Sequence, residues 1–179
     1  ATQYGVQGLD ITHARYPKTS LPKGIFLCGC AHCTRAAAEL GYDMAAMRAD
    51  ITHAFGRFKQ LSHKQLTSLA TSALGPLDLV HFVGLRPGFV DWFRFRADLI
   101  ARNMKRFHTH LHNVTGPDFV FGADNYPASL SLFAGHDQTR WGEFSDFASP
   151  LLSHVDAFPM KTFVAWAKVF QQWFPQLSE

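Results

Sequence analysis

The chain has 179 residues and a net charge of +3, with 47% apolar and 17% charged residues. This length suits one domain with a substantial core, and the composition excludes a disordered chain. The charge is too small and too evenly spread to indicate nucleic acid as a partner, and no apolar stretch is long enough to indicate a membrane as a partner.

The first predicted element lies in residues 6–17, an apolar run that turns polar at its C-terminal end and stops at a proline. This pattern is typical of a buried strand. Parallel sheets build their binding and catalytic sites at the strand ends. We therefore expect Asp10, Thr12, His13 and Arg15 at or near such a rim.

The three cysteines of the chain come next, at Cys28, Cys30 and Cys33. Such crowding is not the disulfide framework of a secreted protein, so we expect a reducing, cytoplasmic compartment. Thiolates at this spacing can surround one structural zinc ion at about 2.3 Å. A closed site needs a fourth ligand, from His32, a distant histidine or another chain. The alternative is three reduced, buried cysteines without a metal.

Helical periodicity and capping residues predict four helices before the next strand. The first covers residues 34–40, Asp43 caps the second, and the third runs from Ser62 to the Gly-Pro pair at 75–76. The longest covers residues 87–112. Its apolar stripe consists of Phe89, Phe93, Ile100, Met104, Phe107 and Leu111.

Three histidines lie near the end of the longest predicted helix, at His108, His110 and His112. Their spacing suggests a set of metal ligands. However, side chains two positions apart on a helix do not face one another. We therefore expect a solvated surface here.

Two further strands are predicted, and both end in polar residues as the first does. Residues 118–124 run into Asp124 and Asn125, and residues 147–152 run towards His154. The polar ends of all three strands would meet at one edge of a parallel sheet.

The order of elements is strand, helices, strand, helix, strand, helix, since residues 138–144 and a segment beginning at Pro159 also have helical patterns. Such alternation predicts a parallel sheet with right-handed crossovers. We therefore expect an α/β fold, a partial (β/α) TIM-type barrel with parallel strands and long flanking helices. A closed barrel needs eight strands, so residues 1–179 are interpreted as a single barrel-like domain that is a fragment of a full barrel.

Residues 9–17, 122–127 and 146–152 resemble strands four, five and six of glycoside-hydrolase-like (β/α)8 barrels. The Cys-x-Cys-x-x-Cys segment at residues 28–33 is similar to that of a family of β-galactosidases, in which it follows strand four and helps to hold zinc with a fourth cysteine from earlier in the barrel. The resemblance implies a glycoside-hydrolase scaffold with a structural zinc.

The chain departs from that family in three ways. Thr12 stands where many of these barrels have a carboxylate, the acid/base Asn-Glu pair is absent near strand four, and strands one to three, seven and eight have no counterpart. Strand seven usually carries the nucleophile. The resemblance therefore implies a scaffold more firmly than an activity.

Asp10 and Asp124 are the candidate catalytic carboxylates, acting as general acid/base and as stabilising group. Glycoside hydrolysis needs two such groups, about 5–5.5 Å apart for retention or about 6.5–9.5 Å apart for inversion. Alternatively, Asp10 pairs with Arg15, and Asp124 has a turn role with Asn125. The candidate substrate-binding residues are His13, Arg15, Asn125 and His154.

The sequence thus predicts a hydrolase, acting on a carbohydrate or another small-molecule substrate. One alternative is a non-catalytic barrel fragment that forms a structural homo-oligomer, and another is a zinc-dependent hydrolase. A three-stranded parallel sheet has two open edges, so we also expect a two-fold homodimer. The last predicted helix, with Phe163, Trp166, Phe170 and Trp173, is the candidate contact.

Overall fold

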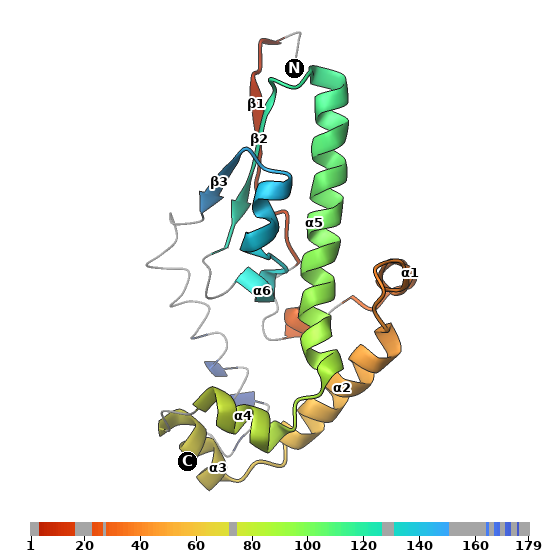
Figure 1. The fold of residues 1–179 in the computed structure, drawn as a ribbon. Helices are drawn as coiled ribbons and strands as arrows, with labels where there is room; N and C mark the ends of the chain where they lie inside the picture. The colour runs from red at the N-terminus through yellow and green to blue at the C-terminus, as the bar shows by residue number, and fades with distance from the viewer. Residues whose placement is uncertain are drawn as a thin grey trace.

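The computed structural model describes residues 4–16, 23–26, 28–71, 75–126 and 131–150, together with residues 164, 167, 168, 171, 172 and 175. Helices dominate these residues, since α5 alone has 29 residues and the strands have 4, 6 and 4 (Figure 1). The helices are α1 (Ala31–Glu39), α2 (Met44–Phe58), α3 (His63–Thr71), α4 (Gly75–Val83), α5 (Pro87–Thr115) and α6 (Ser131–Ala134). The strands are β1 (Gly8–Ile11), β2 (Val120–Asn125) and β3 (Phe147–Pro150), and the 3-10 helices are η2 (Lys23–Phe26) and η4 (Gln138–Glu143).

The three strands form one sheet in the order β1-β2-β3, and both pairings are parallel. The register places Asp10 beside Gly122, Ile11 beside Ala123, and Asp124 beside Ser149. The prediction of three parallel strands in chain order is therefore confirmed. Because the strands are parallel, their carboxyl ends lie at one edge of the sheet.

The prediction of a partial TIM-type barrel with long flanking helices is wrong. Within the described residues the sheet has three short strands and does not close, whereas a barrel needs eight. The connection between β1 and β2 is not one crossover helix, as in a (β/α) barrel, but several helices. It forms α1 to α4 and then α5, and only α5 runs along the sheet (Figure 1). The described fold is mainly helical, with a small parallel sheet.

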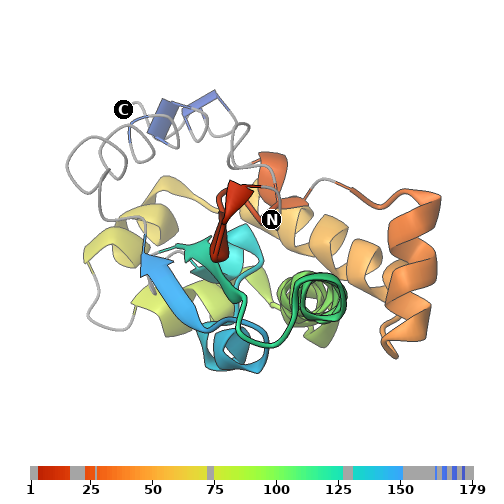
Figure 2. The ribbon, with the colours of Figure 1, turned by 90° about the horizontal axis from the view of Figure 1, so that it is seen from above.

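One face of the sheet packs against α5 and η4 (Figure 2). Strand side chains alternate between faces, so every second residue of β2 points into this core. The buried residues of this cluster are Ala101, Met104, Phe121, Ala123, Trp141 and Phe144. The α5 helix thus joins the sheet to the remaining helices, because its N-terminal half packs on α1 and α2 through Trp92 and Phe95.

Local sequence explains where these helices begin. The Asp43 carboxylate accepts hydrogen bonds from Ala45 N (2.8 Å) and Ala46 N (3.0 Å) at the start of α2, as predicted. At the start of α3, the backbone N of Ser62 donates to Gln65 Oε1 (2.9 Å), and the backbone N of Gln65 donates to Ser62 Oγ (3.3 Å). Each helix is therefore fixed by its own first turn.

The Gly-Pro pair at 75–76 opens a helix instead of ending one, which corrects the predicted extent of the third helix. α3 ends at Thr71, and Gly75 is the first residue of α4. Proline is tolerated in the first turn because the N–H groups there have no acceptor within the helix, so the missing N–H of proline costs no hydrogen bond. The same rule places Pro87 at the start of α5, as predicted, and Gly116 ends that helix with φ of 100°.

No helix in the described part of the chain has the length and apolar character needed to cross a membrane. The residues from 151 onwards are described only at six positions, all of them exposed. His154 and the predicted contact residues Phe163, Trp166, Phe170 and Trp173 therefore lie outside the described residues.

Candidate functional site

Asp10, Thr12 and Asp124 lie on the face of the sheet opposite α5. Alternation along each strand assigns them to this face, since Phe121 and Ala123 point into the core. Asp10 and Thr12 are exposed, and Asp124 is half-buried. Among the described elements, no helix covers this side of the sheet (Figure 2).

The two predicted catalytic carboxylates are diagonal neighbours on this face. Asp10 is paired with Gly122, and Asp124 is two positions further along β2. Strands about 4.8 Å apart, with about 3.3 Å of rise per residue, separate the Cα atoms of such a pair by about 8 Å. The two carboxylates thus lie on one face of the sheet, as the two-carboxylate chemistry of glycoside hydrolysis requires.

Thr12 links Asp124 to His13. The Thr12 hydroxyl donates to Asp124 Oδ2, and the Thr12 oxygen lies 2.7 Å from His13 Nδ1. Because that hydroxyl has one proton, His13 Nδ1 must carry the proton of the second bond. His13 has φ of 69°, an uncommon left-handed conformation for a residue other than glycine. The strand end therefore holds a connected polar group at its rim.

The remaining predicted substrate-binding residues do not join this group. Arg15 lies over the Tyr126 ring, with 4.8 Å from its guanidinium carbon to the ring centroid. Asn125 is buried and lines a surface hollow of about 570 Å³ that includes neither Asp10 nor Asp124. The structure thus brings together Asp10, His13 and Asp124, and separates Arg15 and Asn125 from them.

His136, which sequence reasoning took only for a helix cap, bonds to the ends of both β1 and β2. Its Nε2 lies 2.9 Å from the Ala14 carbonyl, and its Nδ1 accepts from Tyr126 N at 3.3 Å. Burial lowers the pKa of His136 to about 4. The ring is therefore neutral at pH 7 and bridges two strand ends as a structural group.

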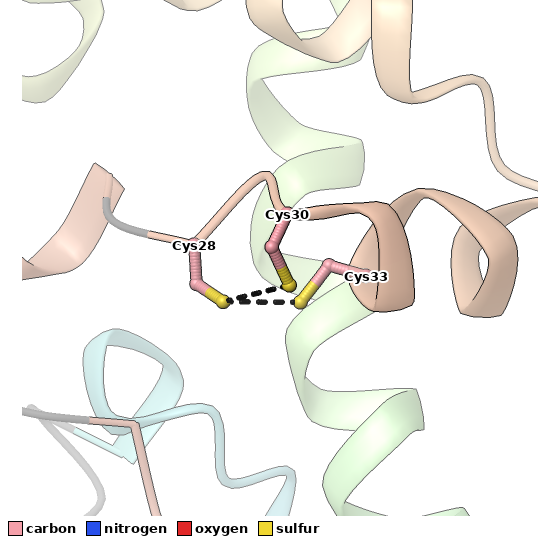
Figure 3. A group of neighbouring side chains, drawn as sticks. All are labelled: Cys28, Cys30 and Cys33. Carbon is pink, nitrogen blue, oxygen red and sulfur yellow. Dashed lines mark hydrogen bonds between the residues drawn. The ribbon is translucent and has the colours of Figure 1, made fainter.

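The three cysteines form the second site, and their sulfur atoms converge on one point (Figure 3). Cys28 Sγ lies 3.2 Å from Cys33 Sγ and 3.7 Å from Cys30 Sγ. Cys28 adopts φ of 83°, which turns the chain into the first turn of α1. Such strain in a residue other than glycine clusters at functional sites. The three sulfurs therefore offer one ready-made set of ligands.

Two of these thiols differ sharply in acidity. The backbone N–H of Cys33 and the thiols of Cys28 and Cys33 lower the pKa of Cys30 to about 7. Burial raises the pKa of the Cys33 thiol to about 12, and the Cys28 thiol adds to this shift. Without a further positive charge, the three sulfurs cannot all be thiolates at neutral pH.

Arg96 and Tyr16 lie close to the cysteines. Arg96 is fully buried, and its guanidinium carbon is 4.1 Å from the Tyr16 ring centroid. Burial lowers the pKa of Arg96 to about 10, whereas Tyr16 and the charges of Cys28 and Cys33 raise it. Burial and then Cys33 raise the pKa of Tyr16. These groups therefore share one electrostatic environment.

The buried guanidinium of Arg96 is incompletely bonded. Its Nη1 donates to the Ile25 carbonyl, but its Nε and Nη2 have no hydrogen-bond partner within the described residues. Sequence reasoning missed this residue, although position 96 falls on the apolar stripe between Phe93 and Ile100. An arginine on a buried helix face was the available signal.

Comparison of the chain with protein-family models, with curated proteins and with solved structures gives no match in any of the three. The functional assignment therefore depends on the geometry of the two sites.

Proposed function

We propose that the chain is a zinc-binding protein in which Cys28, Cys30 and Cys33 hold one structural Zn²⁺ ion. The convergence of the three sulfurs is the observation that carries this proposal, since all three lie within 4.8 Å of one another. A zinc-bound thiol is deprotonated, so the ion supplies the positive charge that lets the three sulfurs be thiolates together.

The sulfur separations suit a tetrahedral ion. Bonds of about 2.3 Å place the sulfurs of a tetrahedral zinc about 3.8 Å apart. The Cys28–Cys30 separation of 3.7 Å already has this value, and the Cys28–Cys33 separation of 3.2 Å needs a small opening. Cys28 and Cys30 are exposed, which leaves a path for the ion to enter.

The surrounding charge also suits such a centre. Three thiolates around Zn²⁺ have a net negative charge, and the Arg96 guanidinium forms no ion pair with a carboxylate in the described part of the chain. A buried cation without a partner is costly, and a nearby anionic cluster offsets that cost. The unpartnered N–H groups of Arg96 therefore support an anionic, metal-loaded form of the cluster.

Residues 1–179 hold three cysteines, so a fourth ligand from within them is a group other than cysteine. His32 lies beside the cluster in sequence, but its Nδ1 is 2.9 Å from Arg35 Nη2. A thiolate-rich site is structural, which argues against the zinc-dependent hydrolase. The role of the zinc ion here is to fix the loop before α1. The thiols must stay reduced, so the proposal includes a reducing compartment such as the cytoplasm.

Cobalt titration of the full chain tests this proposal, because sulfur ligands give Co²⁺ an intense charge-transfer absorption that nitrogen and oxygen ligands do not give. We expect this absorption to reach the amplitude of one sulfur-bound cobalt ion per chain. Cys28→Ser and Cys30→Ser should each weaken binding by about 100-fold or more. Ala38→Ser, on the exposed side of α1, is the control and should bind normally. Absence of the absorption, with three thiols still freely reactive in excess Co²⁺, would contradict the proposal.

As a second candidate function, we propose hydrolysis of a glycoside on the sheet face that carries Asp10 and Asp124. The register favours this function, since it sets the Cα atoms of Asp10 and Asp124 about 8 Å apart on the face that no described helix covers. The bond from Thr12 orients Asp124, and His13 stands beside Thr12. Asp10 would then serve as general acid/base and Asp124 as the stabilising group.

Chromogenic aryl glycosides test this second function. We expect slow turnover that falls about 100-fold or more in Asp10→Asn and in Asp124→Asn, the usual contribution of general acid/base catalysis. Asp118→Asn alters an exposed carboxylate just before β2 and should leave the rate unchanged. Turnover that survives both site variants, or no turnover above the buffer rate, would exclude the hydrolase.

A further inference from the structure

His108 and His112 face one another on α5, although His110 does not share their face. Residues four apart lie one above the other on a helix, unlike residues two apart. The two ring centroids are 4.0 Å apart, and both rings are half-buried. The sequence predicts a solvated surface for all three histidines. This prediction is wrong for His108 and His112, whereas His110 is exposed.

Asp146 completes a cluster with this pair from another part of the chain. It lies between η4 and β3, and two hydrogen bonds hold it to β2. Its backbone N donates to the Phe121 carbonyl at 2.8 Å, and its Oδ2 accepts from Phe121 N at 2.8 Å. One potential ligand atom from each of His108, His112 and Asp146 lies within 4.8 Å of the others.

The hydrogen bonds leave ligand atoms available. His112 Nε2 lies 3.0 Å from the Phe119 carbonyl, and a carbonyl accepts only, so this nitrogen carries the proton and Nδ1 has the lone pair. Metal-bound histidines are commonly oriented in this way by a carbonyl on the other nitrogen. His108 Nε2 is buried and has no hydrogen-bond partner among the described residues.

We propose that His108, His112 and Asp146 bind one divalent first-row transition-metal ion, at a second site separate from the cysteine cluster. Two imidazoles and one carboxylate suit Zn²⁺, Fe²⁺ and their neighbours, and do not suit Ca²⁺ or Mg²⁺. Three protein ligands leave at least one coordination position open for water or a small ligand. A bound ion would join the C-terminal half of α5 to the segment between η4 and β3.

A further observation agrees with this site. The His108 ring packs 5.7 Å from the Phe121 ring, centroid to centroid, which holds the ligand against β2. The site is thus built on a helix and on a residue bonded to a strand.

Zinc binding by the full chain tests the inference, with the zinc content measured after equilibrium dialysis and the free thiols titrated in the same samples. We expect two zinc ions per chain, and one in His108→Ala, with the thiols protected in both. Asp146→Asn keeps an oxygen that can accept from Phe121 N and should bind the second ion about 100-fold more weakly. His110→Ala is the matched control and should still bind two ions.

The outcomes separate the two metal sites. If His108→Ala binds as much zinc as the unaltered chain, the second site is excluded. If the unaltered chain binds one ion that His108→Ala loses, while all thiols stay reactive, the second site stands and the cysteine centre fails. Circular dichroism checks that His108→Ala is folded. If it is folded, and Asp146→Asn binds as much zinc as the unaltered chain, the inference is also overturned.

Discussion

Arg96 is a buried cation that no described carboxylate neutralises, and its surroundings connect the helical core to the cysteines. It stacks on Tyr16, bonds to the Ile25 carbonyl and responds to the charges of Cys28 and Cys33. Arg96 should therefore lower the stability of the metal-free chain and strengthen zinc binding at the cysteines, and both effects can be measured.

Arg96→Met should separate these two effects. Without metal, the free energy of unfolding should stay the same or rise, because a buried charge and two unsatisfied N–H groups are removed. Zinc binding at the cysteines should weaken about 10-fold to 100-fold, because the thiolate cluster loses its neighbouring cation. Arg94→Met is the control, because Arg94 lies two positions earlier on α5 and its side chain is exposed. A large loss of stability with unchanged zinc affinity would contradict this account.

His136 should make stability depend on pH. Its pKa is about 4 in the folded chain, against the ordinary histidine value of 6.5 in the unfolded chain, so the unfolded chain binds the proton more readily between these values. Its contribution to the free energy of unfolding is present above pH 6.5 and is lost as pH falls towards 4. The shift corresponds to about 3 kcal/mol. Protonated Nδ1 could no longer accept from Tyr126 N.

Chemical denaturation of the unaltered chain and of His136→Gln at several pH values measures this loss. The variant should be less stable at pH 7 but should lose less stability between pH 6.5 and 4. His110→Gln, which alters an exposed histidine, should follow the unaltered chain. Equal slopes for His136→Gln and the unaltered chain would show that another group causes the acid sensitivity.

At the scale of elements, the crossing of α2 and α5 depends on Gly88. A Cβ atom there would lie 2.8 Å from Asp50 Oδ2 and 2.9 Å from the Ala46 carbonyl oxygen. The Ala46 backbone cannot move without shifting α2, and Gly88 N also donates to Asp50 at 3.0 Å. The two helices can approach this closely only because residue 88 has no side chain.

Gly88→Ala should therefore lower the free energy of unfolding by about 1–3 kcal/mol, the usual cost of overpacking. Gly56→Ala is the control within α2, since a Cβ there meets nothing within 4 Å. It should raise stability by about 0.5–1 kcal/mol through helix propensity alone. Denaturant titrations of both variants measure the difference. Equal effects in the same direction would contradict the close approach.

Several elements could be predicted from sequence because their signals are local. Asp43 caps α2 through its own neighbours, Pro87 starts α5, and the apolar run before Asp124 forms β2. The cysteines could be grouped because five positions separate the outer pair. In each case, residues close in sequence determine the contact.

The remaining features depend on contacts between distant segments. Asp146 meets His108 and His112 only because α5 packs on β2, and Arg96 meets Tyr16 across 80 positions of the chain. The barrel prediction failed for the same reason. A parallel strand order is consistent with many architectures, and the number of strands is set by the whole sheet rather than by any one strand.

At the scale of the whole molecule, the sheet is covered on one side by the described helices. Parallel strands are usually buried on both faces, and here Val120 and Phe147 remain 42% and 40% exposed on the open side. The outer edges of β1 and β3 have no strand partner among the described residues. The homodimer stays a prediction, and these features add the side of the sheet that no described helix covers as a second candidate contact beside the last predicted helix.

Light scattering at micromolar concentration measures this association. We expect twice the mass of one chain. Phe147→Lys should shift the chain to a monomer, because it places a charge on the face that no described helix covers. Val114→Lys alters an apolar side chain that is 68% exposed on α5 and should leave the dimer intact. A monomer mass for the unaltered chain would exclude the dimer.

X-ray absorption at the zinc edge tests the central claim directly. The measurement uses the His108→Ala variant loaded with one equivalent of Zn²⁺, so that only the cysteine centre is occupied. We predict a shell of three sulfur atoms at about 2.3 Å from the zinc, from Cys28, Cys30 and Cys33. A shell made up only of nitrogen and oxygen atoms at about 2.0–2.2 Å would contradict the proposed centre.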